Sequence, residues 1–202
     1  MRDYSSSELG ILPIVRRLFG SRPHEDSARA LYAGIVAQAR RPEFFIACGV
    51  PDTVDGRFDL LVLHVFLVMH RLKQDRAATA DLSQALVDVF FQDLDESLRE
   101  LGAGDMGIGR RIKAMAEGFY GRTLAYERSL EQGADALEVC VRRNLYGAGE
   151  SGPEQLRAVA LYITDEVAAL AVQDLACLSR GEVLFGPPPQ PAPAGSAGRQ
   201  RR

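Results

Sequence analysis

The stretch that most constrains this chain is residues 49–75, GVPDTVDGRFDLLVLHVFLVMHRLKQD, in which a turn-forming, acidic start leads into a long apolar run. From residue 58 to residue 72 the run has no Pro and no Gly, so it fits a helix better than a strand. It is too short and too interrupted to span a bilayer, which needs about 20 apolar residues. A helix that is apolar nearly all round must be buried nearly all round. We therefore expect an all-α, single compact domain of about six to seven helices around a central buried helix at about residues 52–75.

Further helices are predicted where apolar residues recur at helical spacing. These segments are residues 8–19, 26–40, 77–101, 105–132, 134–146 and 153–178. Ser151 is expected to cap the last of them, with Glu154 completing a capping box. Residues 43–50 fit either one helical turn or a packed connection, and residues 182–185 are the one strand candidate. Gly121, inside a predicted helix, indicates close approach of a neighbouring helix.

The expected organisation has three parts. Residues 1–25 form a short N-terminal helix and linker, and residues 26–185 form the all-α domain. Residues 186–202, GPPPQPAPAGSAGRQRR, are rich in Pro and end in basic residues. Such a segment has little to bury, so we expect it to be a disordered tail.

Composition and charge exclude several functional classes. The chain has 202 residues and a formal net charge of −3, which argues against DNA or RNA as the main partner. No apolar segment is long enough for a membrane span, although peripheral contact with a membrane stays open. Residues 11–19 are interrupted by Pro13, Arg16 and Arg17, which argues against a secretory signal, and the acidic Asp3 and Glu8 argue against a mitochondrial presequence. The three cysteines lack CxxC pairing and are expected to be reduced, mostly structural thiols.

The sequence does not favour catalysis. His64 and His70 are six positions apart, about 240° around a helix, so they cannot share a metal by themselves. There is no nucleophile motif and no phosphate loop, and we expect no enzyme activity, no metal and no cofactor. The alternative is a magnesium-dependent isoprenoid-type helical enzyme that uses two acidic clusters. These clusters are Asp52, Asp55 and Asp59 on the central helix and Asp88, Asp93, Asp95 and Glu96 on the next.

A buried polar network is the second hypothesis from the helical pattern. Arg57, His64 and Arg71 are each seven residues apart and share one edge of the central helix. Asp93 falls inside the apolar stripe of the next helix, and a buried carboxylate is costly unless it is paired. We expect Asp93 to meet His64, Arg57 or Arg122. Such a pair would either fix the helix register or bind a ligand.

Four phrases together resemble one family. They are LYAGIVAQARRPEFF (residues 31–45), GVPDTVDGRFDLLVLH (residues 49–64), DVFFQDLDESLRELGAGD (residues 88–105) and GFYGRTLAYERSL (residues 118–130). In this order they resemble the ubiquinol–cytochrome c chaperone family, the assembly factors for the cytochrome bc complex of respiration. The resemblance covers about half of the chain and leaves the Pro-rich tail outside.

The resemblance implies a non-enzymatic helical chaperone that binds newly made cytochrome b near the ribosomal tunnel exit, together with a small partner subunit. It implies a cytoplasmic location in a bacterium, at the inner face of the membrane, or the mitochondrial matrix in a eukaryote. The need for the partner subunit stays open.

A chaperone for a membrane protein needs an apolar patch on a rigid helical body. The expected patch lies in the connection before the central helix, at Phe44, Phe45, Ile46 and Val50. The acidic start of that helix, Pro51, Asp52, Asp55 and Asp59, would contact positively charged loops of a client. The competing interpretations are core burial for the apolar residues and ordinary helix capping for the acids.

Overall fold

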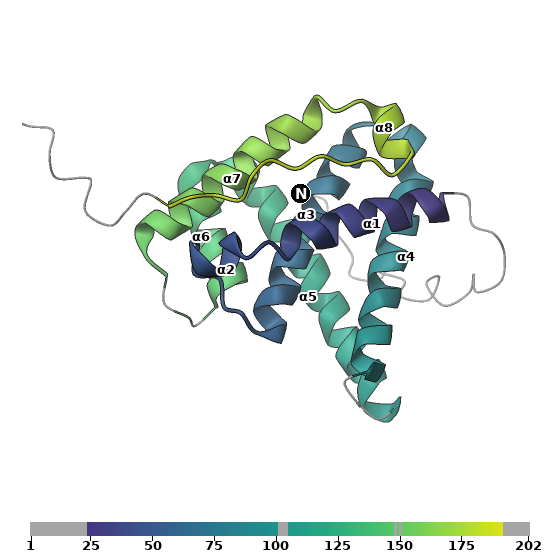
Figure 1. Ribbon diagram of the computed structural model, residues 1–202, viewed down its shortest axis with the longest axis horizontal. Coiled ribbons are helices and arrows are strands. Elements are labelled where there is room, and N and C mark those ends of the chain that lie inside the picture. Colours follow the sequence, from purple (N-terminus) through teal and green to yellow (C-terminus); the bar gives the residue numbers. More distant parts are fainter. Residues whose placement is uncertain (1–23, 101–104, 148, 150, 192–202) are drawn as a thin grey trace, which may run out of the picture.

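Helix α3 (Val54–Gln74) runs through the middle of the molecule, and α1, α4, α5 and α7 all pack against it in the computed structural model (Figure 1). The structure describes residues 24–100, 105–147, 149 and 151–191. Within these ranges the other elements are α1 (Glu25–Ala39), α2 (Glu43–Ile46), α4 (Arg76–Glu100), α5 (Asp105–Gln132), α6 (Ala134–Val141), the π-helical turn η1 (Arg142–Tyr146), α7 (Pro153–Ala171) and α8 (Leu175–Ser179). The all-α prediction is confirmed, and no strand occurs in the described ranges, so residues 182–185 do not form the strand considered for them.

The nearly uniform apolarity of α3 is explained by two cores, one on each side of it. One core joins α3 to α2, α5, α6 and α7, and takes Leu60, Leu63, Phe66 and Leu67 from α3. The other joins α3 to α1, α4 and α8, and takes Val62, Val65, Val68 and Leu72. Full burial of one such side chain is worth about 1.5–3 kcal/mol, so α3 supplies much of the hydrophobic stabilisation.

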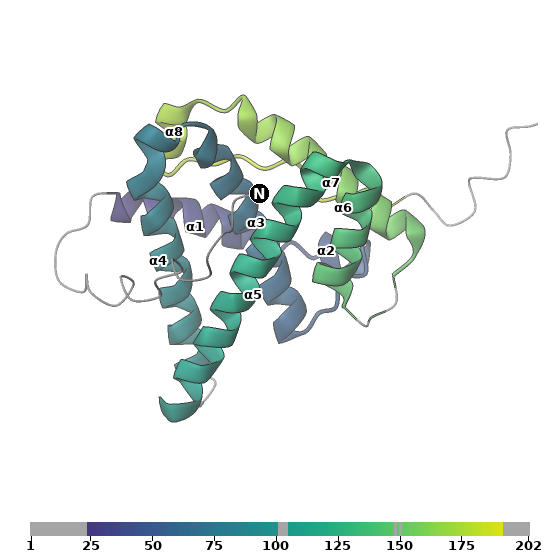
Figure 2. The same ribbon diagram turned by 180° about the vertical axis from the view of Figure 1, so that it is seen from behind.

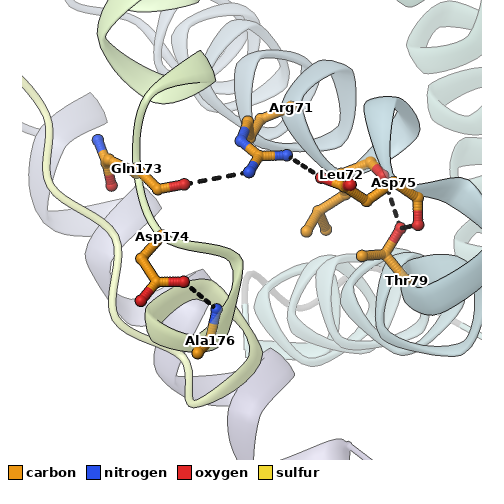
Figure 3. Close-up of polar contacts among 7 residues, drawn as sticks. All are labelled: Arg71, Leu72, Asp75, Thr79, Gln173, Asp174 and Ala176. Carbon is orange, nitrogen blue, oxygen red and sulfur yellow. Dashed lines mark hydrogen bonds and ion pairs between the residues drawn. The ribbon is translucent and has the colours of Figure 1, made fainter.

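A buried arginine, Arg71, joins the C-terminal end of α3 to the α7–α8 turn by hydrogen bonds (Figure 3). The guanidinium of Arg71 donates to Asp75 Oδ2 at 2.6 Å and to the backbone oxygen of Gln173 at 3.0 Å. The hydroxyl of Thr79, in the first turn of α4, donates to the Leu72 carbonyl at 2.6 Å. These bonds satisfy carbonyls that a helix end leaves free, so α3 and α4 follow each other after one intervening residue.

The last predicted helix is two helices. The sequence analysis extended it to residue 178, but α7 ends at Ala171 and α8 begins at Leu175. Asp174 begins α8, because its Oδ1 accepts the Ala176 N–H at 2.9 Å. At the start of α7 the N-cap is Gly152 rather than Ser151. The Gln155 side chain accepts the Gly152 N–H, a role that the sequence analysis gave to Glu154.

After α8 the chain returns along α7 and across α1 toward the segment that follows α2 (Figures 1 and 2). We call residues 183–189 the C-terminal strap. Val183 and Phe185 pack against both cores, and Pro188 and Pro189 are buried. The expectation of disorder from residue 186 is therefore wrong for residues 186–191, because this segment packs on the helical domain and bonds to Gln38, Glu166 and Cys48.

Two predicted segments lie outside the described residues: the helix over residues 8–19 and the tail over residues 192–202. Among the helices that the structure describes, none combines the length and the apolarity needed to cross a membrane.

Candidate partner-binding surface

The start of α3 is built by a chain segment that folds back over the first helical turn. Thr53 is the N-cap, and its hydroxyl accepts the Gly56 N–H at 3.1 Å. A Cβ atom at Gly56 would lie 2.0 Å from the Pro51 carbonyl oxygen, so only glycine fits there. This contact fixes the path of residues 51–53 and holds the neighbouring side chains in place.

Several side chains between Ile46 and Asp55 face solvent. Ile46 and Val54 are 83% and 67% exposed. Asp52 and Asp55 lie within two residues of Val54 in the chain and are also exposed. We call this set, with the half-buried Phe45 and Pro51, the entrance surface: Phe45, Ile46, Pro51, Asp52, Val54 and Asp55.

Arg57 connects the acidic and the aromatic parts of the entrance surface, Asp52 and Phe45. Its Nε donates to Asp52 Oδ1 at 2.6 Å, and its guanidinium carbon lies 5.5 Å from the centre of the Phe45 ring. Arg57 is itself exposed, so the ion pair is screened by water. The surface therefore carries aliphatic side chains, one aromatic ring and carboxylates in neighbouring positions.

Asp59 lies one turn further along α3 and is mostly covered. Arg122 of α5 approaches its Oδ1 to 2.8 Å, within ion-pair distance but without the alignment of a hydrogen bond. The Arg122 guanidinium also lies 5.8 Å from the centre of the Phe58 ring. Burial outweighs the attraction of Arg122 and raises the pKa of Asp59 to about 6. Asp59 joins α3 to α5 and stands behind the entrance surface rather than on it.

Two of the apolar residues expected in the patch are buried instead. Phe44 is 0% exposed and Val50 is 2% exposed. The Phe44 ring packs edge-on against His64 and Tyr162, with ring centres 5.3 Å and 5.4 Å apart. The hypothesis that Phe44 lies on the contact surface is therefore wrong, because the single turn of α2 directs it into the core.

The four residues predicted as one buried network are in separate places. Asp93 is partly buried and accepts the Tyr32 hydroxyl of α1 at 2.7 Å instead of meeting a basic residue. Arg57 pairs with Asp52, and Arg122 pairs with Asp59. A helical wheel gives the angle of a residue on its own helix, but not the neighbour that it meets.

His64 is the one member of that set that is fully buried, and its partners are neutral. Nδ1 donates to the Leu60 carbonyl at 2.8 Å, so Nε2 accepts from the Tyr162 hydroxyl at 2.9 Å. The Gln38 side chain donates to the Tyr162 oxygen at 2.9 Å. Burial lowers the pKa of His64 to about 4. The sequence analysis missed Gln38 and Tyr162, and no spacing rule links them, because they are 124 positions apart.

The two acidic clusters do not share a cavity: Asp93 and Glu96 line one between α1 and α4, and no acid from the start of α3 lines it. Asp52, Asp59 and Asp95 pair with arginines, and Asp93 pairs with Tyr32. Among the described residues, no group of three or more His, Cys, Asp or Glu side chains could hold a metal ion. The arrangement therefore gives no support to the isoprenoid-type enzyme.

Gly121 also differs from expectation. A Cβ atom there would have no heavy atom within 4 Å, so this glycine does not mark a close helix contact.

Comparison with known proteins decides the family. Residues 47–185, more than half of the chain, match the family described as "Ubiquinol-cytochrome C chaperone". The chain belongs to the ubiquinol–cytochrome c chaperone family. The matched range contains most of the entrance surface, all of α3 and all of α7, whereas α1 and the end of the strap lie outside it.

A solved structure of the same kind is the Cbp3 homolog from Brucella abortus, which is 36% identical with a TM-score of 0.72. The alignment covers 82% of this chain and 91% of that one. Curated relatives named ubiquinol–cytochrome c reductase complex assembly factor 1 include proteins of Xenopus laevis and of Mus musculus. The Xenopus protein is 26% identical over 80% of this chain and 81% of its own length. The mouse protein is 24% identical over 80% of this chain, and the match spans 55% of the mouse protein.

Proposed function

We propose that this chain is a non-enzymatic assembly chaperone that binds newly made cytochrome b, or a related subunit of the ubiquinol–cytochrome c reductase complex, through the entrance surface. The observation that carries the proposal is the exposure of Val54 between Asp52 and Asp55 at the start of α3, where Arg57 links Asp52 to the ring of Phe45. Ile46, next to Phe45 in the chain, is exposed as well. Membership of the chaperone family and the names of the assembly-factor relatives support the complex as the destination of the client.

The chemistry of this surface suits a membrane protein before insertion is complete. Such a client has apolar segments next to cytoplasmic loops that are rich in Lys and Arg. Exposed aliphatic side chains would contact the apolar segment, and the carboxylates of Asp52 and Asp55 would attract the basic loop. Because both carboxylates are exposed, their contribution would be to association rate and specificity more than to affinity.

The proposal extends to the place of action. We place this contact near the ribosomal tunnel exit, with or without a small partner subunit. The location would be the bacterial cytoplasm at the inner face of the membrane, or the mitochondrial matrix if the chain is eukaryotic. No DNA contact is part of the proposal.

The experiment is complementation of a strain that lacks this chain. We expect the strain to lose assembled ubiquinol–cytochrome c reductase and its haem b absorbance, while unrelated respiratory enzymes stay at normal levels. The wild-type chain should restore both, and cytochrome b should copurify with it. The double variant Asp52→Lys, Asp55→Lys should restore less, although its circular dichroism should match the wild type.

The matched control is Asp81→Lys, Glu131→Lys, which changes the charge equally at two exposed acids on α4 and α5. It should behave as the wild type. Normal haem b spectra in the deletion strain would remove the proposed function. Equal copurification of cytochrome b with both double variants would leave the function and remove the entrance surface as its site.

A further inference from the structure

The C-terminal strap is held in a way that differs from the rest of the molecule. Among the described residues, no backbone-to-backbone hydrogen bond reaches the strap; its backbone bonds all come from side chains. The amide of Gln173 makes two of them. Its Nε2 donates to the Leu184 carbonyl at 2.6 Å, and its Oε1 accepts the Leu184 N–H at 3.1 Å. The Gln173 amide thus bonds to both the N–H and the carbonyl of Leu184, as the backbone of a neighbouring strand would in a sheet.

The same pattern recurs two residues later. The Gly186 N–H donates to Glu166 Oε1 at 2.7 Å, and the Gly186 carbonyl accepts from Gln38 at 2.9 Å. A Cβ atom at Gly186 would lie 2.6 Å from Glu166 Oε1, so a larger residue there would displace the Glu166 carboxylate that accepts the backbone N–H. Further on, the Cys48 thiol donates to the Pro189 carbonyl at 3.3 Å.

The strap's side chains alternate as in an extended ligand. Val183 and Phe185 point inward and pack against both cores, whereas Leu184 between them is 77% exposed. The Phe185 ring meets His64 edge-on, with ring centres 5.5 Å apart. The facing surface therefore has sites for two apolar side chains two residues apart, with paired polar groups for the backbone between and after them. Peptide-binding grooves recognise extended chains in this manner.

We propose that the surface under the strap is an exchangeable peptide groove, and that its second occupant is an extended apolar segment of the client with the pattern apolar–any–apolar–glycine. Recognition through backbone groups tolerates different sequences, so the strap would occupy the groove until such a segment replaces it. Only the naming of a client protein as the source of the segment rests on the proposed function; the groove itself does not.

A free peptide must compete with a strap that belongs to the same chain, and this competition determines the design of the test. The strap is tethered to the groove, which gives it an effective concentration on the order of millimolar. A free peptide therefore competes poorly with the wild-type strap. A substitution that weakens the strap and leaves the groove intact removes this disadvantage. Phe185→Ala is such a change, because Gln173, Glu166, Gln38 and Cys48 all remain.

The experiment measures, by anisotropy, binding to full-length chains of a fluorescently labelled peptide of residues 182–190, EVLFGPPPQ, which contains the strap. Phe185→Ala should bind the peptide about 10- to 100-fold more tightly than the wild type does. Leu184→Ala is the matched control, because that side chain faces solvent, and it should bind as weakly as the wild type. A peptide with Ala in place of the phenylalanine should bind neither variant tightly.

Absence of binding to a folded Phe185→Ala chain would overturn the groove. If that chain does not fold, Val183→Ala replaces it, because this change shortens a strap side chain and leaves Gln173, Glu166, Gln38 and Cys48 in place. Hydrogen exchange on the wild type gives an independent result: the Leu184 and Gly186 amides should exchange faster than the buried amides of α3. Equal protection of the strap amides and the α3 amides would show that the strap does not leave the groove, and would overturn the proposal.

A wild-type dimer that exchanges straps between copies would also overturn the proposal, because the occupant would be a second copy. The Asp52→Lys, Asp55→Lys variant should bind the peptide normally, so failure of the groove and failure of the proposed function are distinguishable.

Discussion

The hydroxyl of Tyr162 lies 2.9 Å from Nε2 of His64 and joins α7 to α3 through a fully buried hydrogen bond. Gln38 of α1 donates to the same hydroxyl and also to the strap at Gly186. One chain of hydrogen bonds therefore runs from the centre of α3 through α7 and α1 to the strap. Both ring nitrogens of His64 and the Tyr162 hydroxyl have partners in it, which is the condition for polar groups inside a core.

Removing the Tyr162 hydroxyl should be costly for this reason. Tyr162→Phe leaves His64 Nε2 without its donor and one Gln38 N–H without its acceptor, both in buried positions. We expect the free energy of unfolding in urea at pH 7 to fall by about 1–3 kcal/mol. Tyr120→Phe, at a ring that is 48% exposed, should change it by less than about 0.5 kcal/mol. An equal loss in the two variants would contradict the network.

The buried His64 should make the fold sensitive to acid. Its pKa falls from 6.5 to about 4 on folding, so the unfolded chain binds the proton more readily. Its contribution to stability is complete above pH 6.5 and is lost as the pH falls toward 4, for a total of about 3 kcal/mol. Asp59 acts in the opposite sense, because its pKa rises from 3.8 to about 6. Its contribution is present below pH 3.8 and is lost as the pH rises through 6. Between pH 4 and 6 the two contributions should largely cancel.

Two variants separate these contributions in urea titrations across pH 4–7. Asp59→Asn should uncover the acid loss due to His64, whereas His64→Phe should leave a chain that gains stability as the pH falls. Parallel pH profiles of the two variants would contradict both assignments.

The entrance of α3 should not accept a larger residue at position 56. Gly56→Ala places a methyl group 2.0 Å from the Pro51 carbonyl oxygen, so the backbone must move. We expect a loss of more than about 2 kcal/mol in the free energy of unfolding. Gly121→Ala is the opposite case, since the site is open and helical; it should stabilise the chain by up to about 1 kcal/mol. Thermal unfolding of both variants is sufficient to test the difference.

The buried guanidinium of Arg71 should matter more than its exposed neighbour. Arg71→Met leaves the Gln173 carbonyl and Asp75 without their donor, and we expect a loss of about 2–4 kcal/mol. Lys73→Met removes an ion pair with Glu127 in which the lysine side chain is 62% exposed, and should cost less than about 1 kcal/mol. Similar urea midpoints for the two variants would contradict the structural role of Arg71.

The sequence predicted the parts of this molecule that follow from pattern along one helix. The apolar run of residues 58–72 identified the central helix, and the spacing of apolar residues identified the helices around it. What it could not predict were partners on other elements. Asp93 meets Tyr32 rather than a base, because the α1–α4 packing, and not the wheel, decides its neighbour.

The strap was missed for a related reason. A Pro-rich composition predicts disorder, yet burial of Pro189 depends on Cys48, 141 positions earlier. The available signal was the alternation of Val183 and Phe185, which also suggested a strand. For the entrance surface, the acidic start of α3 was visible in the sequence, but the choice between Phe44 and Ile46 as the exposed residue required the geometry of a single helical turn.

Because the strap covers Cys48 through its contact with Pro189, the reaction rate of the Cys48 thiol can report on the position of the strap. Burial raises the pKa of the Cys48 thiol to about 11, so the closed chain should react slowly with thiol reagents at neutral pH. Each departure of the strap would uncover that sulfur. In a chain in which Cys177, the more accessible thiol, is replaced by serine, the rate of Cys48 labelling would report how often the groove stands empty.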